Sequence, residues 1–259
     1  MCAVGREEAR DARRVRGLIV PYQYRADALF EWIERVNGPI WGDALDAGTG
    51  AHSLSWMATL PTRSLTAVTV EDWRLGELPT IAPSARIVRG EWTDPALLHG
   101  EAWDQVLIDY VIGAIDGHAP YFQYDYLERL RPHCRGAVYL VGLEPPPRDG
   151  SLLDQVCRTR DACILLAGHR MYREYPSALV QRWMERAGMR VRDMKVFPNR
   201  VGARFVNGQL DVAKRKLPLF ADRGLAEAMG RQIEQLRAAA LAPGEVTWGA
   251  DYVIAADVR

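Results

Sequence analysis

The fold of this chain is decided by the stretch Ala44-Leu45-Asp46-Ala47-Gly48-Thr49-Gly50-Ala51-His52-Ser53. It consists of an apolar strand end, a glycine turn and the beginning of a helix. Glycines in such a turn carry no side chain, so the backbone can approach a ligand closely. An isolated Gly-x-Gly also occurs in turns that bind nothing, so the surrounding segments must decide between a site and a structural turn.

Strands and helices alternate on both sides of this turn. Apolar residues at helical spacing predict a helix over residues 27–36. Further helices are expected at residues 53–59 and 121–130 and from Asp94-Pro95, where Asp is a typical N-cap. Strands are expected at 44–46, 65–70, 86–88, 106–108, 137–143, 189–197 and 252–256. This alternation predicts an α/β fold: a Rossmann-like, doubly wound, mostly parallel seven-stranded sheet.

The C-terminal half has a different character. A helix is expected over residues 152–166, an aromatic and charged loop over 169–175, and a helix after Pro176. A long helical insertion, residues 207–242, separates the last two strands. We interpret these segments as helical lid insertions in one domain.

The composition excludes several classes of protein. The 259 residues include 33 basic and 33 acidic side chains, and 48% are hydrophobic. A globular protein without a field that attracts nucleic acid or an anionic membrane is therefore expected. The four cysteines form no Cys-x-x-Cys pair, so no metal site is predicted. No segment approaches the roughly 18 apolar residues of a membrane-spanning helix, and a cytoplasmic protein is expected.

Two cofactor classes compete for the glycine turn. The dinucleotide fingerprint Gly-x-Gly-x-x-Gly would place its third glycine at Ser53. Asp46, just before the turn, would repel a pyrophosphate but suits a ligand that carries a cationic amine. The residues favour such a ligand over NAD.

Asp46-Ala47-Gly48-Thr49-Gly50 resembles motif I of the class I S-adenosylmethionine (SAM) dependent methyltransferases. Gly90-Glu91-Trp92 and Asp104–Tyr110 follow in the order of that family, over roughly residues 41–143. The resemblance implies SAM as the cofactor, bound by the turn residues and by acids at the strand ends. The cofactor-binding residues that it implies are Asp46, Gly48, Gly50, Glu71, Glu91, Trp92 and Asp109.

The resemblance also assigns roles and leaves one ambiguity. Glu71 would accept hydrogen bonds from the ribose hydroxyls, and Glu91 would accept one from the adenine amine. Asp72 is the alternative to Glu71 if the strand register is off by one. His52 stands where many relatives have a further glycine, so its side chain could lie at the edge of the SAM site. The chain is then divided into an N-terminal cover (1–37), a cofactor-binding core (38–145), a lid and helix (146–189) and the last strands with their insertion (190–259).

Acceptor residues are expected beyond the carboxyl ends of the strands. His118, Tyr110 and Glu144 are the catalytic candidates, with His118 the best base by its ordinary pKa. Many aromatic side chains near one opening favour a small aromatic or heterocyclic acceptor. The candidate substrate-binding residues are Tyr22, Tyr24, Tyr121, His169, Tyr172 and Tyr175.

The predicted function is methyl transfer from SAM to a small, natural-product type metabolite. The Asn/Asp-Pro-Pro-aromatic signature of nucleic acid base methyltransferases is absent, because Asp109-Tyr110-Val111-Ile112 occupies its place. An overall likeness to bacterial indole methyltransferases is the one hint at the substrate. The sequence leaves open a homodimer, a catalytically silent SAM-fold binding or regulatory protein, and a nicotinamide-dependent oxidoreductase.

Overall fold

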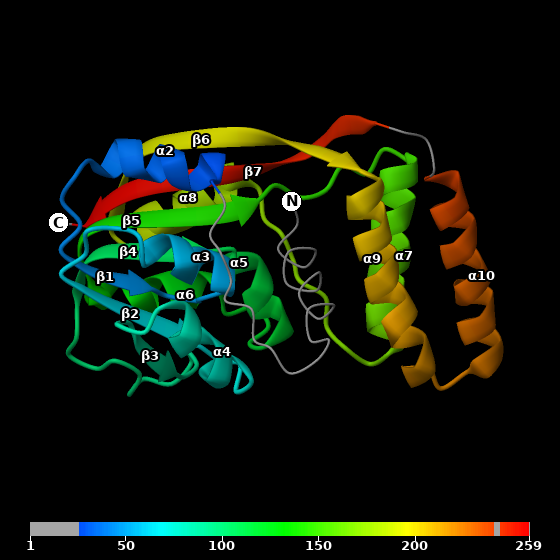
Figure 1. Cartoon of the computed structure of the whole chain (residues 1–259), viewed down its shortest axis with the longest axis horizontal. Helices are drawn as coiled ribbons and strands as arrows, with labels where there is room; N and C mark the ends of the chain where they lie inside the picture. The colour runs from blue at the N-terminus through cyan, green and yellow to red at the C-terminus, as the bar shows by residue number, and fades with distance from the viewer. Residues whose placement is uncertain (1–25, 241–243, 259) are drawn as a thin grey trace.

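A computed structural model describes residues 26–240 and 244–258, which form a seven-stranded sheet with helices on both faces (Figure 1). The strand order is β3-β2-β1-β4-β5-β7-β6. The strands are β1 (Asp43–Asp46), β2 (Ser64–Thr69), β3 (Arg86–Arg89), β4 (Trp103–Asp109), β5 (Cys134–Leu143), β6 (Met189–Gly202) and β7 (Glu245–Val258).

The sheet is mostly parallel, as the sequence predicts. Strands β1 to β5 pair in parallel, and β7 runs antiparallel to its neighbours β5 and β6. The predicted fold class is therefore confirmed. Strands β6 and β7 extend well beyond the apolar cores, 189–197 and 252–256, that the sequence predicts. Much of β6 is exposed and polar, so an apolar pattern in the sequence indicates only part of the strand.

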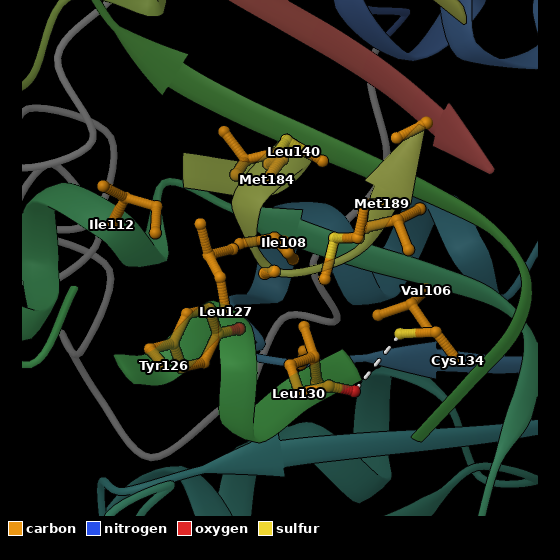
Figure 2. Close-up of a cluster of buried hydrophobic side chains, with 14 of the residues drawn as sticks. Val106, Ile108, Ile112, Tyr126, Leu127, Leu130, Cys134, Leu140, Met184 and Met189 are labelled. Carbon is orange, nitrogen blue, oxygen red and sulfur yellow. Dashed lines mark hydrogen bonds between the residues drawn. The ribbon is translucent and has the colours of Figure 1, made fainter. Parts of the chain in front are cut away.

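The two faces of the sheet are covered by different helices because side chains alternate along each strand. The helices are α2 (Ala28–Asn37), α3 (Ala51–Met57), α4 (Arg74–Ile81), α5 (Val111–Ala114), α6 (Gln123–Leu130) and α8 (Ser177–Arg186). Val106 and Ile108 of β4 belong to the apolar cluster with α6 and α8, whereas Leu107 belongs to the cluster with α2, α3 and α4. Figure 2 shows the first cluster, in which Met184 and Leu127 approach the strand residues.

Helix α2 confirms the helix predicted near residues 27–36. The side chain of Asp27 accepts a hydrogen bond from the backbone N–H of Leu29 (3.0 Å), which caps the N-terminus. Leu29, Phe30 and Ile33 are buried on one face, against the sheet. The apolar spacing in the sequence therefore corresponds to a real buried face.

One predicted helix is wrong, and the helices α4 and α5 were not predicted. Asp94 does accept a hydrogen bond from the N–H of Ala96 (2.9 Å), but residues 95–100 form turns. Leu98 and Gly100 both have positive φ angles, so the chain turns toward β4 instead of continuing a helix. Helix α4 escaped prediction because Gly76 and Pro79 are poor helix formers whose preference is overridden by packing.

Three long helices pack beside one another where β6 and β7 extend past the other strands (Figure 1). They have an apolar cluster of their own, which includes Val156, Leu210 and Ile233. Helix α7 spans the predicted residues, and two helices cover the predicted insertion, the first of which begins four residues earlier than expected, at Ala203. These elements are α7 (Leu152–Leu166), α9 (Ala203–Lys216), the short 3-10 helix η4 (Leu217–Leu219) and α10 (Arg223–Ala239). Within the described ranges, none of the helices is long and apolar enough to cross a membrane.

Candidate functional site

A cavity of about 150 Å³, partly open to solvent, lies at the carboxyl ends of β1, β2, β3 and β4. The chain runs from β1 outward to β3 and then returns to place β4 on the other side of β1. Ligands of doubly wound sheets bind where the strand order reverses in this way. The cavity therefore occupies the position that the fold favours for a ligand.

The glycine turn forms one wall of this cavity. Ala47, Gly48 and Thr49 line it. A Cβ atom on Gly48 would stand 2.2 Å from Cγ2 of Val111, so only glycine permits this approach of the β1 turn to α5. Gly50 lies behind these residues as the N-cap of α3, and its N–H donates to Oγ of Ser53 (3.1 Å).

Asp46 lies beneath the turn and is completely buried. Neither carboxylate oxygen accepts a hydrogen bond of ordinary geometry from the described residues. Burial raises the pKa of Asp46 to about 6, an effect that the nearby hydroxyls of Thr49 and Ser53 only partly offset. Its negative charge is consequently poorly compensated until a cation approaches the turn.

Glu71 and Asp72, the two candidates for the acid after β2, point to different environments. Glu71 lines the cavity, and Nε1 of Trp73 donates a short hydrogen bond to its carboxylate. Asp72 is exposed and pairs with Nε of Arg89 at 2.9 Å. The geometry therefore favours Glu71 as the acid that a ligand would meet.

The segment after β3 contributes the next wall. Glu91 and Trp92 both line the cavity. Trp92 is buried, and its Nε1 donates to the carbonyl oxygen of Ala47 (2.6 Å), which ties this segment to the glycine turn. Its ring packs edge-on against Tyr126. Glu91 is exposed, so its carboxylate is free to meet a polar group at the cavity edge.

The end of β4 closes the opposite side. Asp109 and Tyr110 line the cavity, and Tyr110 has a left-handed backbone with φ of 57°. Such a conformation is uncommon for a bulky residue and often marks a functional turn. An apolar wall continues from this point and contains Val111, Ala114, Ile115, Ala119 and Phe122.

His118 and Tyr172 stand at the mouth. His118 is exposed and follows the 3-10 helix η2 (Ile115–Gly117). Tyr172 comes from the loop 169–175, here named the lid loop, and its ring lies against Gly117. Arg170 anchors this loop, donating to the carbonyl of Asp116 (2.9 Å) and to its buried carboxylate (3.1 Å).

The other predicted acceptor residues lie outside the cavity lining. Tyr121 is 73% exposed beneath the guanidinium of Arg170. His169 is exposed and bonds to Nζ of Lys216, and Tyr175 packs on Trp183. Glu144 lies at a smaller pocket and accepts from the N–H of Ser177 (3.2 Å). Tyr22 and Tyr24 lie outside the described residues.

The side chain of His52 also points away from the cavity. Its Nε2 lies 3.1 Å from the carboxylate of Asp27, and its ring lies 5.2 Å from that of Phe30. It does not belong to the cavity lining. The side chain therefore ties α3 to the beginning of α2.

Sequence reasoning missed Arg74, a buried cation that lines the cavity. Its charge lowers the pKa of Asp46, and its guanidinium stacks on the ring of Trp73 at 4.3 Å. A sequence signal existed, since Arg74 closely follows Glu71, but nothing distinguished it from a surface arginine. Among the described residues, no group of three or more His, Cys, Asp or Glu side chains is placed to hold a metal ion.

Known proteins resemble this chain in three-dimensional structure but not detectably in sequence. Neither a family model nor a curated protein matches the chain. A candidate methyltransferase from Bacillus halodurans aligns over 90% of this chain and 99% of its own, with 14% identity and a TM-score of 0.59. A cyclopropane-fatty-acyl-phospholipid synthase-like protein from Lactobacillus casei aligns over 89% of both chains, with 11% identity and a TM-score of 0.60.

A third structure is a 1,6-didemethyltoxoflavin-N1-methyltransferase from Burkholderia thailandensis. It contains bound 1,6-didemethyltoxoflavin and S-adenosylhomocysteine, and aligns over 89% of this chain and 77% of its own, with 16% identity and a TM-score of 0.51. None of these three is an indole methyltransferase, so that likeness stays a prediction. The chain has the fold of the class I SAM-dependent methyltransferases.

Proposed function

We propose that this protein transfers a methyl group from SAM to a small molecule. The observation that carries the proposal is the convergence of four separate segments on one cavity. The turn at 47–49, Glu71, the Glu91-Trp92 pair and Asp109 all line it, although they lie at or just after the carboxyl ends of four different strands. These motifs resemble those of the class I SAM-dependent methyltransferases, and solved structures with a similar fold include methyltransferases.

The cavity residues fit the charges of SAM. Asp46 is a buried carboxylate without an ordinary hydrogen bond from the described residues, so a cationic amine at the turn would lower the cost of its charge. Glu71, oriented by Trp73, offers a carboxylate oxygen to a ribose diol. When bound, SAM supplies an already activated methyl group on a sulfonium. The protein then has to align the acceptor and exclude water.

The acceptor is proposed to be a small aromatic or heterocyclic molecule. The wall formed by α5, η2 and Phe122 is apolar, and Tyr172 offers an aromatic face at the mouth. The Burkholderia thailandensis methyltransferase, which has a similar fold, has both 1,6-didemethyltoxoflavin and S-adenosylhomocysteine bound. His118 and Tyr172 are proposed to contact the acceptor, with Tyr110 on the inner side of the cavity.

Ligand binding separates this proposal from its alternatives. S-adenosylhomocysteine (SAH) and SAM should each raise the melting temperature, because a ligand at about a hundredfold excess over Kd stabilises by about 2.7 kcal/mol. NAD should give no shift; a shift with NAD alone would instead support an oxidoreductase. Methyl transfer to a panel of phenols, arylamines and N-heterocycles then separates an enzyme from a silent SAM-binding protein.

A further inference from the structure

Arg74 is a buried cation in a cavity that is otherwise rich in acids. Among the described residues that line this cavity, it is the only arginine or lysine, whereas Glu71, Glu91 and Asp109 carry carboxylates. A further carboxylate, that of Asp46, lies beneath the glycine turn. Arg74 is 3% exposed, and an arginine is rarely buried to this extent unless its charge serves an anion.

The turn between β2 and α4 directs Arg74 into the cavity wall. The backbone N–H of Arg74 donates to the carbonyl oxygen of Glu71 (3.1 Å), so one tight turn holds both residues. The guanidinium lies over the ring of Trp73 at 4.3 Å, and Nε1 of Trp73 in turn donates to the Glu71 carboxylate. A guanidinium donates hydrogen bonds only in its own plane, so this stacking restricts the direction in which Arg74 can bind a ligand.

The carboxylate of Glu77 is too far away to account for this arrangement. Nη1 of Arg74 lies 4.0 Å from Oε2 of Glu77, beyond the range of a hydrogen bond. An ion pair of this kind, between residues three apart on one helix, stabilises only weakly. The pair therefore explains neither the burial of Arg74 nor its place in the cavity wall.

Arg74 and Asp46 lie close enough for the charge of one to influence the other. Helix α4 packs on α3, the helix that follows the glycine turn. Burial raises the pKa of Asp46, and the charge of Arg74 is among the effects that lower it. The cavity therefore presents an acid and a cation near the same turn.

The amino acid end of SAM carries an ammonium group and a carboxylate on one carbon atom. An ammonium group placed at Asp46 brings the ligand carboxylate near Asp46 as well, where the two negative charges repel each other. A guanidinium offsets this repulsion, because its planar N–H groups can donate two parallel hydrogen bonds to a carboxylate. In the described part of the cavity lining, only Arg74 carries such a group.

We propose that Arg74 binds the carboxylate of the SAM amino acid moiety while Asp46 faces its ammonium group. This inference rests on the proposed function and deepens it: the two residues select ligands with a zwitterionic amino acid and reject adenosine compounds that lack the carboxylate. Because SAM and SAH share this moiety, Arg74 acts in ligand binding and not in the transfer step.

SAH and decarboxylated SAH differ only in that carboxylate, so calorimetry with both ligands provides a test that needs no acceptor. The unaltered protein should bind SAH roughly 10- to 100-fold more tightly than the decarboxylated compound, the range expected for hydrogen bonds to a charged group. In Arg74→Met the ratio of the two affinities should fall to about one, because the group that distinguishes the ligands is gone. Arg89→Met removes an exposed arginine that pairs with Asp72 and should leave the ratio unchanged.

Two further variants keep the test decisive even if Arg74→Met folds poorly. Arg74→Lys keeps the positive charge but loses the paired N–H groups, so its affinity ratio should lie between those of the unaltered protein and Arg74→Met. Asp46→Asn should instead weaken both ligands by a similar factor, because both carry the amine. Equal affinity of the unaltered protein for the two ligands, or an equal loss of both in Arg74→Met, overturns the inference. Failure of both ligands to bind the unaltered protein rejects the proposed function itself, which is a distinct result.

Discussion

Gly48 and Val111 are in such close contact that a Cβ atom on the glycine would stand 2.2 Å from Cγ2 of the valine. The contact joins the turn after β1 to the helix after β4, the two strands between which the sheet order reverses. It therefore fixes the width of the cavity at the point where a ligand is expected.

Gly48→Ala is expected to weaken SAH binding by at least tenfold and to destabilise the fold by about 1–3 kcal/mol, as overpacking does. Valine has one strongly preferred rotamer in a helix, so it cannot easily turn away. The double variant Gly48→Ala/Val111→Ala removes the obstructing methyl group and should recover part of the affinity. Calorimetry with SAH measures both effects, and equal losses in the single and double variants would rule out the steric explanation.

Asp46 should make stability fall as pH rises. Its folded pKa of about 6 lies above its usual value of 3.8, so the folded state binds the proton more tightly than the unfolded state does. The stabilisation is present below about pH 4 and is lost as the pH rises to about 6, a change of roughly 3 kcal/mol. Asp46→Asn should lose this pH dependence and bind SAH more weakly.

Urea unfolding at pH 4 and pH 7.5 checks this prediction, with Asp72→Asn as an exposed control. Glu174 has a raised pKa as well, so the comparison is between each variant and the unaltered protein and not between absolute curves. If Asp46→Asn and the unaltered protein lose the same stability between the two pH values, the buried charge is not the cause.

Glu71 and Asp72 form a matched pair for testing the cofactor site. Glu71→Gln should reduce SAH affinity by about 1.5–3 kcal/mol, the usual worth of hydrogen bonds to a charged group. Asp72→Asn should change it little, because that carboxylate pairs with Arg89 on the surface. Binding calorimetry on both proteins decides the register; the reverse order of effects would show that Asp72 is the ligand.

Arg170 should control the lid loop. Its side chain is 45% exposed, but the Asp116 carboxylate that it binds is buried, so losing the arginine should cost more than the roughly 1 kcal/mol of a fully exposed pair. Arg170→Ala should also increase hydrogen exchange in residues 169–175 and accelerate SAH dissociation. Arg86→Ala, which removes an exposed pair with Glu101, is the control for loss of an arginine on the surface. Unchanged exchange in the lid loop would mean that its other contacts suffice.

His118 should affect the kinetics of any acceptor that the substrate panel identifies. His118 lines the cavity and is exposed, so His118→Ala should mainly raise KM for the acceptor. A fall in kcat of roughly 10²–10⁴-fold with KM unchanged would instead give His118 the role of general base, in line with the sequence-based expectation. Steady-state kinetics with the acceptor concentration varied separate the two outcomes.

The sequence by itself determined the sheet and the region of the cavity proposed to bind the cofactor. Apolar alternation and helical spacing are local properties, so they indicated all seven strands and most helices. The motif residues Gly48, Glu71, Glu91 and Asp109 lie at or just after the ends of separate strands, and parallel strands necessarily bring their carboxyl ends to one edge. Local signals failed where packing overrode them, as in α4 and in the segment after Asp94.

Only the tertiary structure decided which side chains around the mouth meet one another. Tyr121, Tyr172 and Tyr175 are equivalent in sequence, yet Tyr172 alone of the three lines the cavity. Arg74 went unnoticed because its burial, and not its residue type, makes it unusual. Contacts between the lid loop and α5 join residues about sixty positions apart, and no local pattern encodes them, because they depend on how the chain returns over the sheet.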